Sequence, residues 1–281
     1  MPEMHAVKRL AWEALFYAAL LLLLVSVAFP FFWMVKTSVE TGQGLFSYPP
    51  HLLPAAYSLE GYRTVLEQTS VGLWLWNSVL VASVSTILAL TAGVSGAYGL
   101  SRFRYRGKRM LALVILTTQM MPPLVLIIPI YTIFIQLGLT DNLLGLILGN
   151  FAFSLPVVIW MMKSIFDSIP FEIEEAARVD GASWLCVLTR VTVPIALPGL
   201  VATGIFTFLA GWDEFMFART IVTSTSKWVG TVGLASFIGA YVTPWDQILA
   251  AATIFTLPPV LLFLAVQKYF IAGLGAGGVK G

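Results

Sequence analysis

The sequence predicts an all-α integral membrane protein with six membrane-spanning helices, and three observations lead to this fold class. Of the 281 residues, 58% are hydrophobic and only 11% are charged, with a mean hydropathy of +0.88. Six stretches without Asp, Glu, Lys or Arg each exceed the roughly 20 residues that cross a bilayer as a helix. No segment alternates polar and apolar residues as the ~10-residue strands of a membrane barrel do. Helices satisfy their own backbone hydrogen bonds in lipid, so a helical bundle is expected.

The chain, residues 1–281, is expected to form one transmembrane domain. The first apolar stretch follows Lys8 and Arg9, as a cleaved signal peptide would, but its uncharged core is too long and FPFFWMV has no small-residue cleavage pattern. We therefore expect it to be retained. The spans are predicted at residues 14–36, 75–100, 110–136, 143–163, 195–217 and 247–268.

The basic residues predict that both termini lie in the cytoplasm, because short cytoplasmic loops are enriched in Lys and Arg. With six spans, the segment SRFRYRGKR at 101–109 is cytoplasmic, and only four of the 16 basic residues are external: Lys36, Arg63, Arg219 and Lys227. A seventh span at 228–245 would move Lys268 and Lys280 outside and weaken this asymmetry. The predicted external loops are 37–74 and 218–246, and the long cytoplasmic loop is 164–194.

Residues that would support catalysis or metal binding are scarce. The single Cys186 excludes an internal disulfide, and His5 and His51 fall in a terminal tail and a loop. No HExxH motif occurs, and the tail GLGAGGVKG lacks the GxxxxGK[ST] spacing of a phosphate loop. We expect no ATP hydrolysis, no intramembrane catalysis and no cofactor of the chain's own.

The spans contain few ionisable residues with which a gradient could be coupled to transport. Asp213 and Glu214, at the end of the fifth span, are the exceptions. Secondary transporters usually carry such residues within their spans. If a solute moves through this bundle, its energy is expected to come from a partner. A secondary transporter and a non-transporting membrane scaffold remain alternatives from other classes.

The cytoplasmic segment 163–194, KSIFDSIPFEIEEAARVDGASWLCVLTRVTVP, predicts a short helix, a turn and a second helix. Pro170 suits a helix start and Gly181 suits a left-handed helix end. Glu174 and Arg178 have the i, i+4 spacing of a helical ion pair. The small side chains of Ala176 and Ala177 would let another backbone approach closely. On these grounds the segment is either a docking face or an ordinary solvated connector.

A motif in this segment resembles one from a known family. Glu175-Ala176-Ala177, three residues, Gly181, nine residues and then Val191-Thr192-Val193-Pro194 follow the EAA motif of bacterial ABC importer permeases, with Val in place of Ile and Leu. Further stretches are similar to the carbohydrate-uptake branch typified by the smaller permease subunit of the maltose transporter. These are GYRTVL (61–66), NSVLVA (77–82), QMMPPLVLIIPIYTIFIQLGLTDN (119–142), GWDEFMFA (211–218), with Asp213 where Asn is commoner, and the glycine-rich C-terminus.

The resemblance implies a type I ABC importer permease in a bacterial or archaeal cytoplasmic membrane. Its partners would be a second, homologous permease, two cytoplasmic ABC ATPases that bind ATP and Mg, and an extracytoplasmic solute-binding protein; nucleic acid is not expected. The solute would be a sugar or oligosaccharide, with glycerol phosphate, a glycerophosphodiester, a polyamine or an oxyanion as alternatives. The residues implied in ATPase coupling are Glu174, Glu175, Ala176, Ala177, Arg178, Asp180, Gly181 and Pro194.

Two further sets of candidate functional residues are identified by their positions in the chain. The resemblance implies that the C-terminal Gly278, Val279, Lys280 and Gly281 contact the ATPases, and a frayed tail is the alternative. Polar groups within spans or at their ends are candidates for the solute pathway: Gln119, Asn150, Trp212, Asp213 and Glu214. Interfacial solvation explains the acids equally well, and an aromatic belt explains the tryptophan. Segment 228–245 either lies at the lipid interface or reaches the binding protein.

Overall fold

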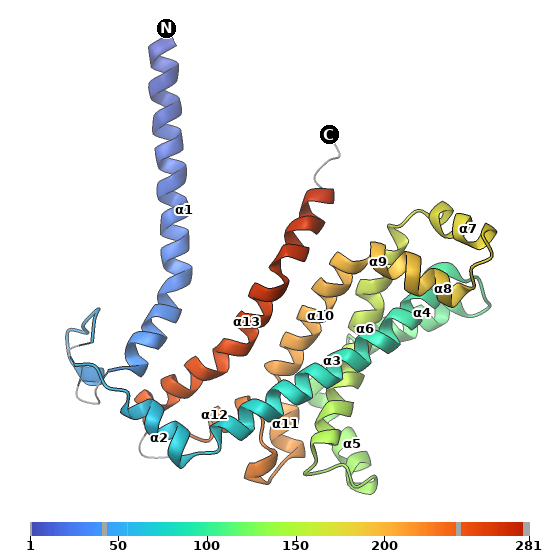
Figure 1. The fold of residues 1–281 in the computed structure, drawn as a ribbon. Helices are drawn as coiled ribbons and strands as arrows, with labels where there is room; N and C mark the ends of the chain where they lie inside the picture. The colour runs from blue at the N-terminus through green and yellow to red at the C-terminus, as the bar shows by residue number, and fades with distance from the viewer. Residues whose placement is uncertain (1, 41–43, 55, 240–242, 278–281) are drawn as a thin grey trace. The chain divides into compact units, whose positions relative to one another are not determined.

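The computed structural model describes residues 2–40, 44–54, 56–239 and 243–277, and these are almost entirely helical (Figure 1). Within these ranges the β-pairing is limited to an isolated bridge between Glu40 and Tyr57. The α-helices are α1 (Pro2–Ser38), α2 (Glu60–Gln68), α3 (Val71–Arg102), α4 (Lys108–Thr118), α5 (Pro123–Gln136), α6 (Leu143–Asp167), α7 (Phe171–Val179), α8 (Trp184–Val187), α9 (Val193–Ile195), α10 (Leu197–Trp212), α11 (Met216–Ile221), α12 (Gly230–Ala235) and α13 (Trp245–Gly277). The 3-10 turns are η1 (Gly44–Phe46) and η3 (Thr225–Lys227), and η2 (Leu188–Thr192) is π-helical.

Four of these helices contain segments long and apolar enough to cross a membrane, namely α1, α3, α6 and α13. Two further candidate spans are pairs of bent helices. Helices α4 and α5 meet at 98°, and the segments Trp184–Ile195 and Leu197–Trp212 meet at 82°. If each bent pair is counted as one span, the described chain has six spans in the predicted order.

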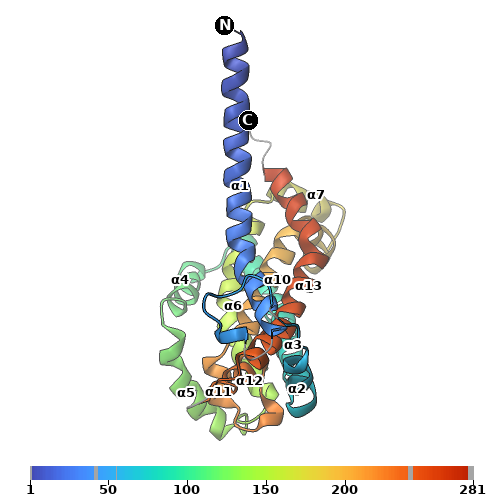
Figure 2. The same ribbon diagram turned by 90° about the vertical axis from the view of Figure 1, so that its left-hand side faces the viewer.

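Prolines lie at both bends. The bend between α4 and α5 interrupts the predicted span 110–136. The second bend lies at the start of the predicted span 195–217, which is instead interrupted where α10 ends at Trp212 and α11 begins at Met216. Pro122 has an extended backbone, with ψ of 127°, and Pro123 opens α5. A proline disfavours the helical conformation in the residue before it, and a second proline directly afterwards reinforces the break. Pro194 has no N–H to donate to the preceding turn, and the π-helical residues of η2 lie just before it. Figure 2 shows the chain turning between α4 and α5.

The contacts divide the chain, which the sequence analysis treats as one domain, into two compact units. The first comprises the residues up to Thr69 together with Phe237–Phe255. In it Lys36 and Glu40 form a buried ion pair near the end of α1, and Ser38 shares a hydrogen bond of 2.8 Å with the hydroxyl of Tyr62. The apolar side chains that precede this pair on α1 are largely exposed.

The second unit comprises Ser70–Ser236 and the chain from Thr256 onward, and its core is formed by α3, α6 and α10. Both views show these helices side by side (Figures 1 and 2). A Cβ atom added to Gly93 would lie 2.4 Å from a methyl carbon of Val158, so the glycine is needed where α3 approaches α6. Small residues permit such close packing in membranes. One apolar cluster surrounds Phe217 and Leu146, and another surrounds Phe166 and Met162.

The described part of the predicted external loop 218–246 contains the end of α11, η3, α12 and the first residues of α13, and none of the candidate membrane spans lies wholly within it. Three side chains from the start of α3 hold this loop. Trp74 Nε1 donates to the carbonyl of Thr225 at 2.9 Å, and Asn77 Nδ2 donates to the carbonyls of Ser226 and Trp228 at 3.1 and 2.8 Å. Ser78 Oγ accepts from the N–H of Gly230. Residues 225–230 are therefore held against the start of α3.

Candidate functional site

Helix α7 contains the EAA-like residues and begins and ends where its sequence predicts. Pro170 is the N-cap, with ψ of 132°. At the other end Gly181 has φ of +87°, and the N–H groups of Gly181 and Ala182 donate to the carbonyls of Arg178 and Ala177 at 3.0 and 3.1 Å. This is the Schellman pattern, in which a left-handed residue satisfies the last helical carbonyls. The glycine therefore fixes the direction in which the chain leaves α7.

The side chain of Glu174 anchors α7 to the end of α3. Its carboxylate accepts a hydrogen bond of 2.8 Å from Arg102 Nε and another of 2.8 Å from the hydroxyl of Tyr98. Arg102 also donates to the carbonyl of Ile169 at 3.0 Å. The side chains of Glu174 and Arg102 are 0% and 7% exposed. Because both ions are withdrawn from water and hydrogen-bonded, removal of either would leave an uncompensated buried charge.

The predicted i, i+4 ion pair between Glu174 and Arg178 is wrong. The guanidinium of Arg178 lies over the ring of Trp184, with its central carbon 4.7 Å from the ring centroid, and it donates to the carbonyl of Ala182. Helical spacing predicts Arg178 as a partner for Glu174, but the Glu174 carboxylate instead accepts hydrogen bonds from Arg102 and Tyr98 of α3. Glu174 is consequently turned into the chain and presents no surface to a partner.

The opposite face of α7 is exposed and partly apolar. Glu175, Ala176 and Asp180 are exposed, and Ala177 is half-buried. Ile173 is 42% and Val179 is 87% exposed. An apolar surface bordered by acids on a short helix at the end of the bundle is typical of an interaction site. Pro194, the last predicted coupling residue, is exposed but belongs to α9 at the bend before α10 rather than to α7.

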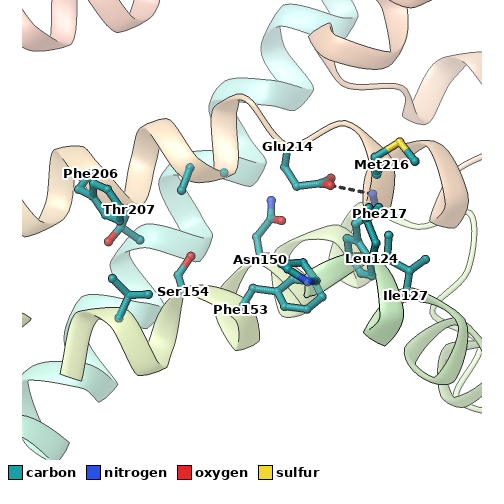
Figure 3. Close-up of a pocket in the computed structure, with 14 residues that line it drawn as sticks. Leu124, Ile127, Asn150, Phe153, Ser154, Phe206, Thr207, Glu214, Met216 and Phe217 are labelled. Carbon is teal, nitrogen blue, oxygen red and sulfur yellow. Dashed lines mark hydrogen bonds between the residues drawn. The ribbon is translucent and has the colours of Figure 1, made fainter. Parts of the chain in front are cut away.

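A pocket with a volume of about 440 Å³ lies in the second unit, between α5, α6 and α10 (Figure 3). Its walls are mostly apolar and aromatic. The lining residues are Pro123, Leu124, Ile127, Asn150, Phe153, Ser154, Val157, Phe206, Thr207, Ala210, Gly211, Glu214, Met216 and Phe217. An apolar cavity with a few convergent polar groups is the usual form of a small-molecule site.

The polar groups of the pocket differ in how they are satisfied. Both carboxylate oxygens of Glu214 accept backbone hydrogen bonds at the start of α11, from Phe217 at 2.7 Å and Ala218 at 2.8 Å. Thr207 donates to the carbonyl of Thr203. The amide of Asn150 makes no hydrogen bond to the described residues, and in Figure 3 it rises from α6 toward α10 beside Ser154. The hydroxyl of Ser154 likewise makes no hydrogen bond to the described residues, so Asn150 and Ser154 are the groups best placed to receive a polar ligand.

Of the five predicted pathway residues, the structure brings together Asn150 and Glu214. Gln119 is exposed at the C-cap of α4, and Asp213 is exposed at the C-cap of α10. Trp212 is buried and stacks on Phe208, with ring centroids 5.6 Å apart. None of these three lines the pocket. The predicted C-terminal contacts, Gly278, Val279, Lys280 and Gly281, lie outside the described residues.

Sequence reasoning missed the aromatic walls of the pocket and Ser154. Phe153, Phe206 and Phe217 look like any lipid-facing residue of an apolar span, and no sequence signal distinguishes them. Ser154 follows Asn150 by four positions, which places both on one face of a helix. That spacing of two polar residues within an apolar segment is a signal that could have found it.

On the external side, Asp141 ties the α5–α6 turn to the loop after α11. Its backbone is left-handed, with φ of 51°, and its N–H donates to the carbonyl of Ile221 at 2.8 Å. The carboxylate accepts from the hydroxyl of Ser224 and from the N–H groups of Thr223 and Ser224, at 3.0 and 2.8 Å for the two N–H groups. Hydrogen bonds from Ser224 above all lower the pKa of this carboxyl. We call these contacts the Asp141 clamp.

Bent helix pairs, an exposed EAA-like helix and a pocket within the bundle together define a membrane transport permease. The profile of the family described as "Binding-protein-dependent transport system inner membrane component" matches residues 85–275, and the chain belongs to this family. It is accordingly a multi-pass protein of the cytoplasmic membrane.

Several relatives match over nearly the whole chain. The inner membrane ABC transporter permease protein YcjP of Escherichia coli K12 is 35% identical, over 95% of this chain and 96% of its own length. SmoH of Agrobacterium fabrum, a sulfoquinovosyl glycerol transport system permease protein, is 33% identical over 94% and 93%. MalG of Thermococcus litoralis, a trehalose/maltose transport system permease protein, is 32% identical over 93% and 94%.

Solved structures agree with the fold. A chain of a bacterial ABC transporter involved in the import of the acidic polysaccharide alginate matches with a TM-score of 0.78 and 26% identity, over 92% of this chain and 96% of that one. A chain of the MetNI methionine ABC transporter in an inward-facing conformation matches with a TM-score of 0.61 over 71% of this chain and 94% of that one. At 16% identity, the second likeness concerns the fold alone.

Proposed function

We propose that the chain is the membrane-spanning translocation subunit of an ATP-driven, binding-protein-dependent importer of a sugar or oligosaccharide. The observation that carries this proposal is α7, a helix anchored on one face through Glu174 and exposed on the other along EAA-like residues. Relatives named as transporters of trehalose, maltose, diacetylchitobiose and sulfoquinovosyl glycerol support the class of solute.

The proposed complex contains a second, homologous permease, two cytoplasmic ABC ATPases and an extracytoplasmic solute-binding protein. ATP and Mg would be bound by the ATPases, and this chain would bind no cofactor and catalyse no reaction. The exposed face of α7, with Glu175, Ala176, Val179 and Asp180, would enter a cleft of one ATPase. The small Ala176 allows close approach, and the exposed Val179 supplies apolar area to bury.

The mechanism proposed for coupling follows from the two attachments of α7. The chain connects α7 to α6 through residues 168–170, and the Glu174–Arg102 pair connects it to α3. Closure of the ATPases would displace α7, and both helices would move with it. Because the pocket lies between α6 and α10, such a displacement would alter its walls. The bundle would thereby alternate between inward- and outward-facing states.

The lining of the pocket favours a neutral polyhydroxylated solute over the phosphate-containing alternatives. No Lys or Arg is among the described lining residues, and Glu214 is an acid. A phosphate group calls for charge-assisted donors, which this lining does not supply. Asn150 and Ser154 can exchange hydrogen bonds with hydroxyl groups, and the phenylalanine rings can pack against the apolar faces of a sugar ring.

The test is reconstitution of the full chain in vesicles with its partner permease, ATPases and binding protein. Uptake of a radiolabelled oligosaccharide that the binding protein recognises, together with solute-stimulated ATP hydrolysis, is the expected result. Purification from mild detergent as an isolated chain, with no ATPase or second permease, would argue against the complex. Uptake of glycerol phosphate in place of sugar would leave the coupling proposal intact and overturn the solute class.

A further inference from the structure

The turn between α3 and α4 carries a groove that neither the coupling helix nor the pocket uses. It has a volume of about 700 Å³ and belongs entirely to the second unit. We call it the basic groove and define it by its lining residues: Tyr105, Gly107, Lys108, Arg109, Met110, Ala112 and Leu113. Because α3 and α4 both belong to membrane spans, the groove lies where the chain leaves and re-enters the bilayer.

The groove and its rim carry positive charge that the described part of the chain does not neutralise. Arg104, Arg106 and Arg109 are exposed and form no ion pair with any described residue. Arg102, by contrast, is used by Glu174. Lys108 Nζ donates to the carbonyls of Phe103 and Ser101 at 3.1 and 3.4 Å, which holds its ammonium over the turn. The cationic side chains therefore remain available to an anion.

The other half of the groove is apolar. Met110 is 66% and Leu113 is 50% exposed, and both follow directly along α4 from the cationic side chains. A soluble anion such as free phosphate would use the charges but would leave this apolar surface uncovered. A lipid supplies both a headgroup and a hydrocarbon chain, and its headgroup lies at the depth of the turn.

We propose that the basic groove binds an anionic phospholipid of the cytoplasmic leaflet, with its phosphate near Lys108 and Arg109 and one acyl chain along Met110 and Leu113. The negative surface of that leaflet attracts basic residues close to the ends of membrane helices, and basic pockets there bind acidic headgroups. The groove adds a shaped apolar surface to this attraction. A bound lipid would fix the position of α4, whose own side chains are largely exposed.

The experiment measures lipid binding to the purified full chain by native mass spectrometry in mild detergent. Phosphatidylglycerol and phosphatidylcholine with identical acyl chains are titrated separately at fixed ionic strength. Phosphatidylglycerol is expected to bind at least tenfold more tightly. Arg106→Gln and Arg109→Gln should each weaken its binding about fivefold, and salt should weaken it further. The matched control is Arg190→Gln, an exposed cytoplasmic arginine outside the groove, with an expected change below twofold.

A separate substitution tests the apolar half of the basic groove. Leu113→Ser should weaken the binding of both lipids by a similar factor. This result would distinguish contact with an acyl chain from a purely electrostatic association of headgroups with the basic residues. Equal affinity for the two lipids, or equal effects of Arg109→Gln and Arg190→Gln, would overturn the proposal. Unchanged lipid binding combined with loss of copurifying ATPase in Arg106→Gln would identify the groove as a protein contact and would equally overturn it.

Discussion

Replacing Glu174 with alanine should release α7 from α3 without unfolding the bundle. The substitution leaves the guanidinium of Arg102, 7% exposed, without a carboxylate partner, although it still donates to the carbonyl of Ile169 at 3.0 Å and to the hydroxyl of Ser101 at 3.4 Å. Breaking a buried ion pair by removing one partner typically costs about 3–5 kcal/mol. Since α7 is a nine-residue helix at the end of the bundle, this cost should appear as local opening rather than as loss of the three-helix core.

A cost of that size corresponds to a roughly 10²- to 10⁴-fold increase in the local opening constant, at about 1.4 kcal/mol per factor of ten. Hydrogen–deuterium exchange of residues 171–179 in the purified full chain measures this increase directly. In the reconstituted complex, Glu174→Ala should reduce solute uptake more than it reduces ATP hydrolysis, because the ATPases would move a helix that no longer moves α3.

The matched control is Glu172→Ala, which removes an exposed acid from the first turn of the same helix. It should change exchange little, because an exposed charge at a helix start contributes about 0.3–1 kcal/mol. The double variant Glu174→Ala/Arg102→Ala should be less perturbed than the sum of the single variants, since no unpaired ion remains. Exchange in Glu174→Ala that equals the wild-type rate would refute the assignment of the ion pair as the anchor.

Gly181→Val should lower transport and its coupling to ATP hydrolysis while membrane insertion is preserved. A left-handed conformation costs an L-residue about 1–2 kcal/mol. Gly99→Ala, at a helical position with open space around it, is the control, and normal solute-stimulated ATP hydrolysis in Gly181→Val would count against the role. Asn150→Leu should raise the KM for uptake about two- to tenfold with little change in kcat, as loss of one hydrogen bond predicts; an unchanged KM would exclude Asn150 from the pathway. The Asp141 clamp should be intact above the ordinary carboxyl pKa, near 4, and should open as pH falls through the lowered pKa of the folded chain. Exchange at residues 222–225, corrected for the intrinsic effect of pH, should show this opening, and Asp141→Asn should abolish its pH dependence; an identical profile in that variant would exclude the carboxylate as the cause.

The sequence predicts those parts of the fold that are determined by residues close together in the chain. Helix α7 could be located because Pro170 and Gly181 act within one turn of its ends. The bend inside the predicted span 110–136 was missed although its prolines are visible, because a proline alone does not determine the outcome. Pro156 lies inside the continuous α6, whereas the adjacent Pro122 and Pro123 separate α4 from α5.

The candidate sites were predictable only where the residue type is unusual for its surroundings. Asn150 and Glu214 stand out as polar groups at membrane depth, and both line the pocket. The partner of Glu174 could not be found in the same way. Arg178 is four residues from Glu174 in the sequence, whereas Arg102 is 72 residues away. Helical periodicity predicts contacts only between residues of the same helix, so it indicates Arg178 and not Arg102. Long-range packing decided the pairing.

The Asp141 clamp also has a consequence for how the chain is made. Asp141 precedes α6, whereas Thr223 and Ser224 follow α10, so these groups leave the ribosome on either side of two spans. They meet only if both of those spans have been inserted in the correct orientation. The Glu174–Arg102 pair imposes the same condition on the other face of the membrane. A chain inserted with one span inverted or skipped would leave these groups on opposite faces of the membrane and therefore without their partners.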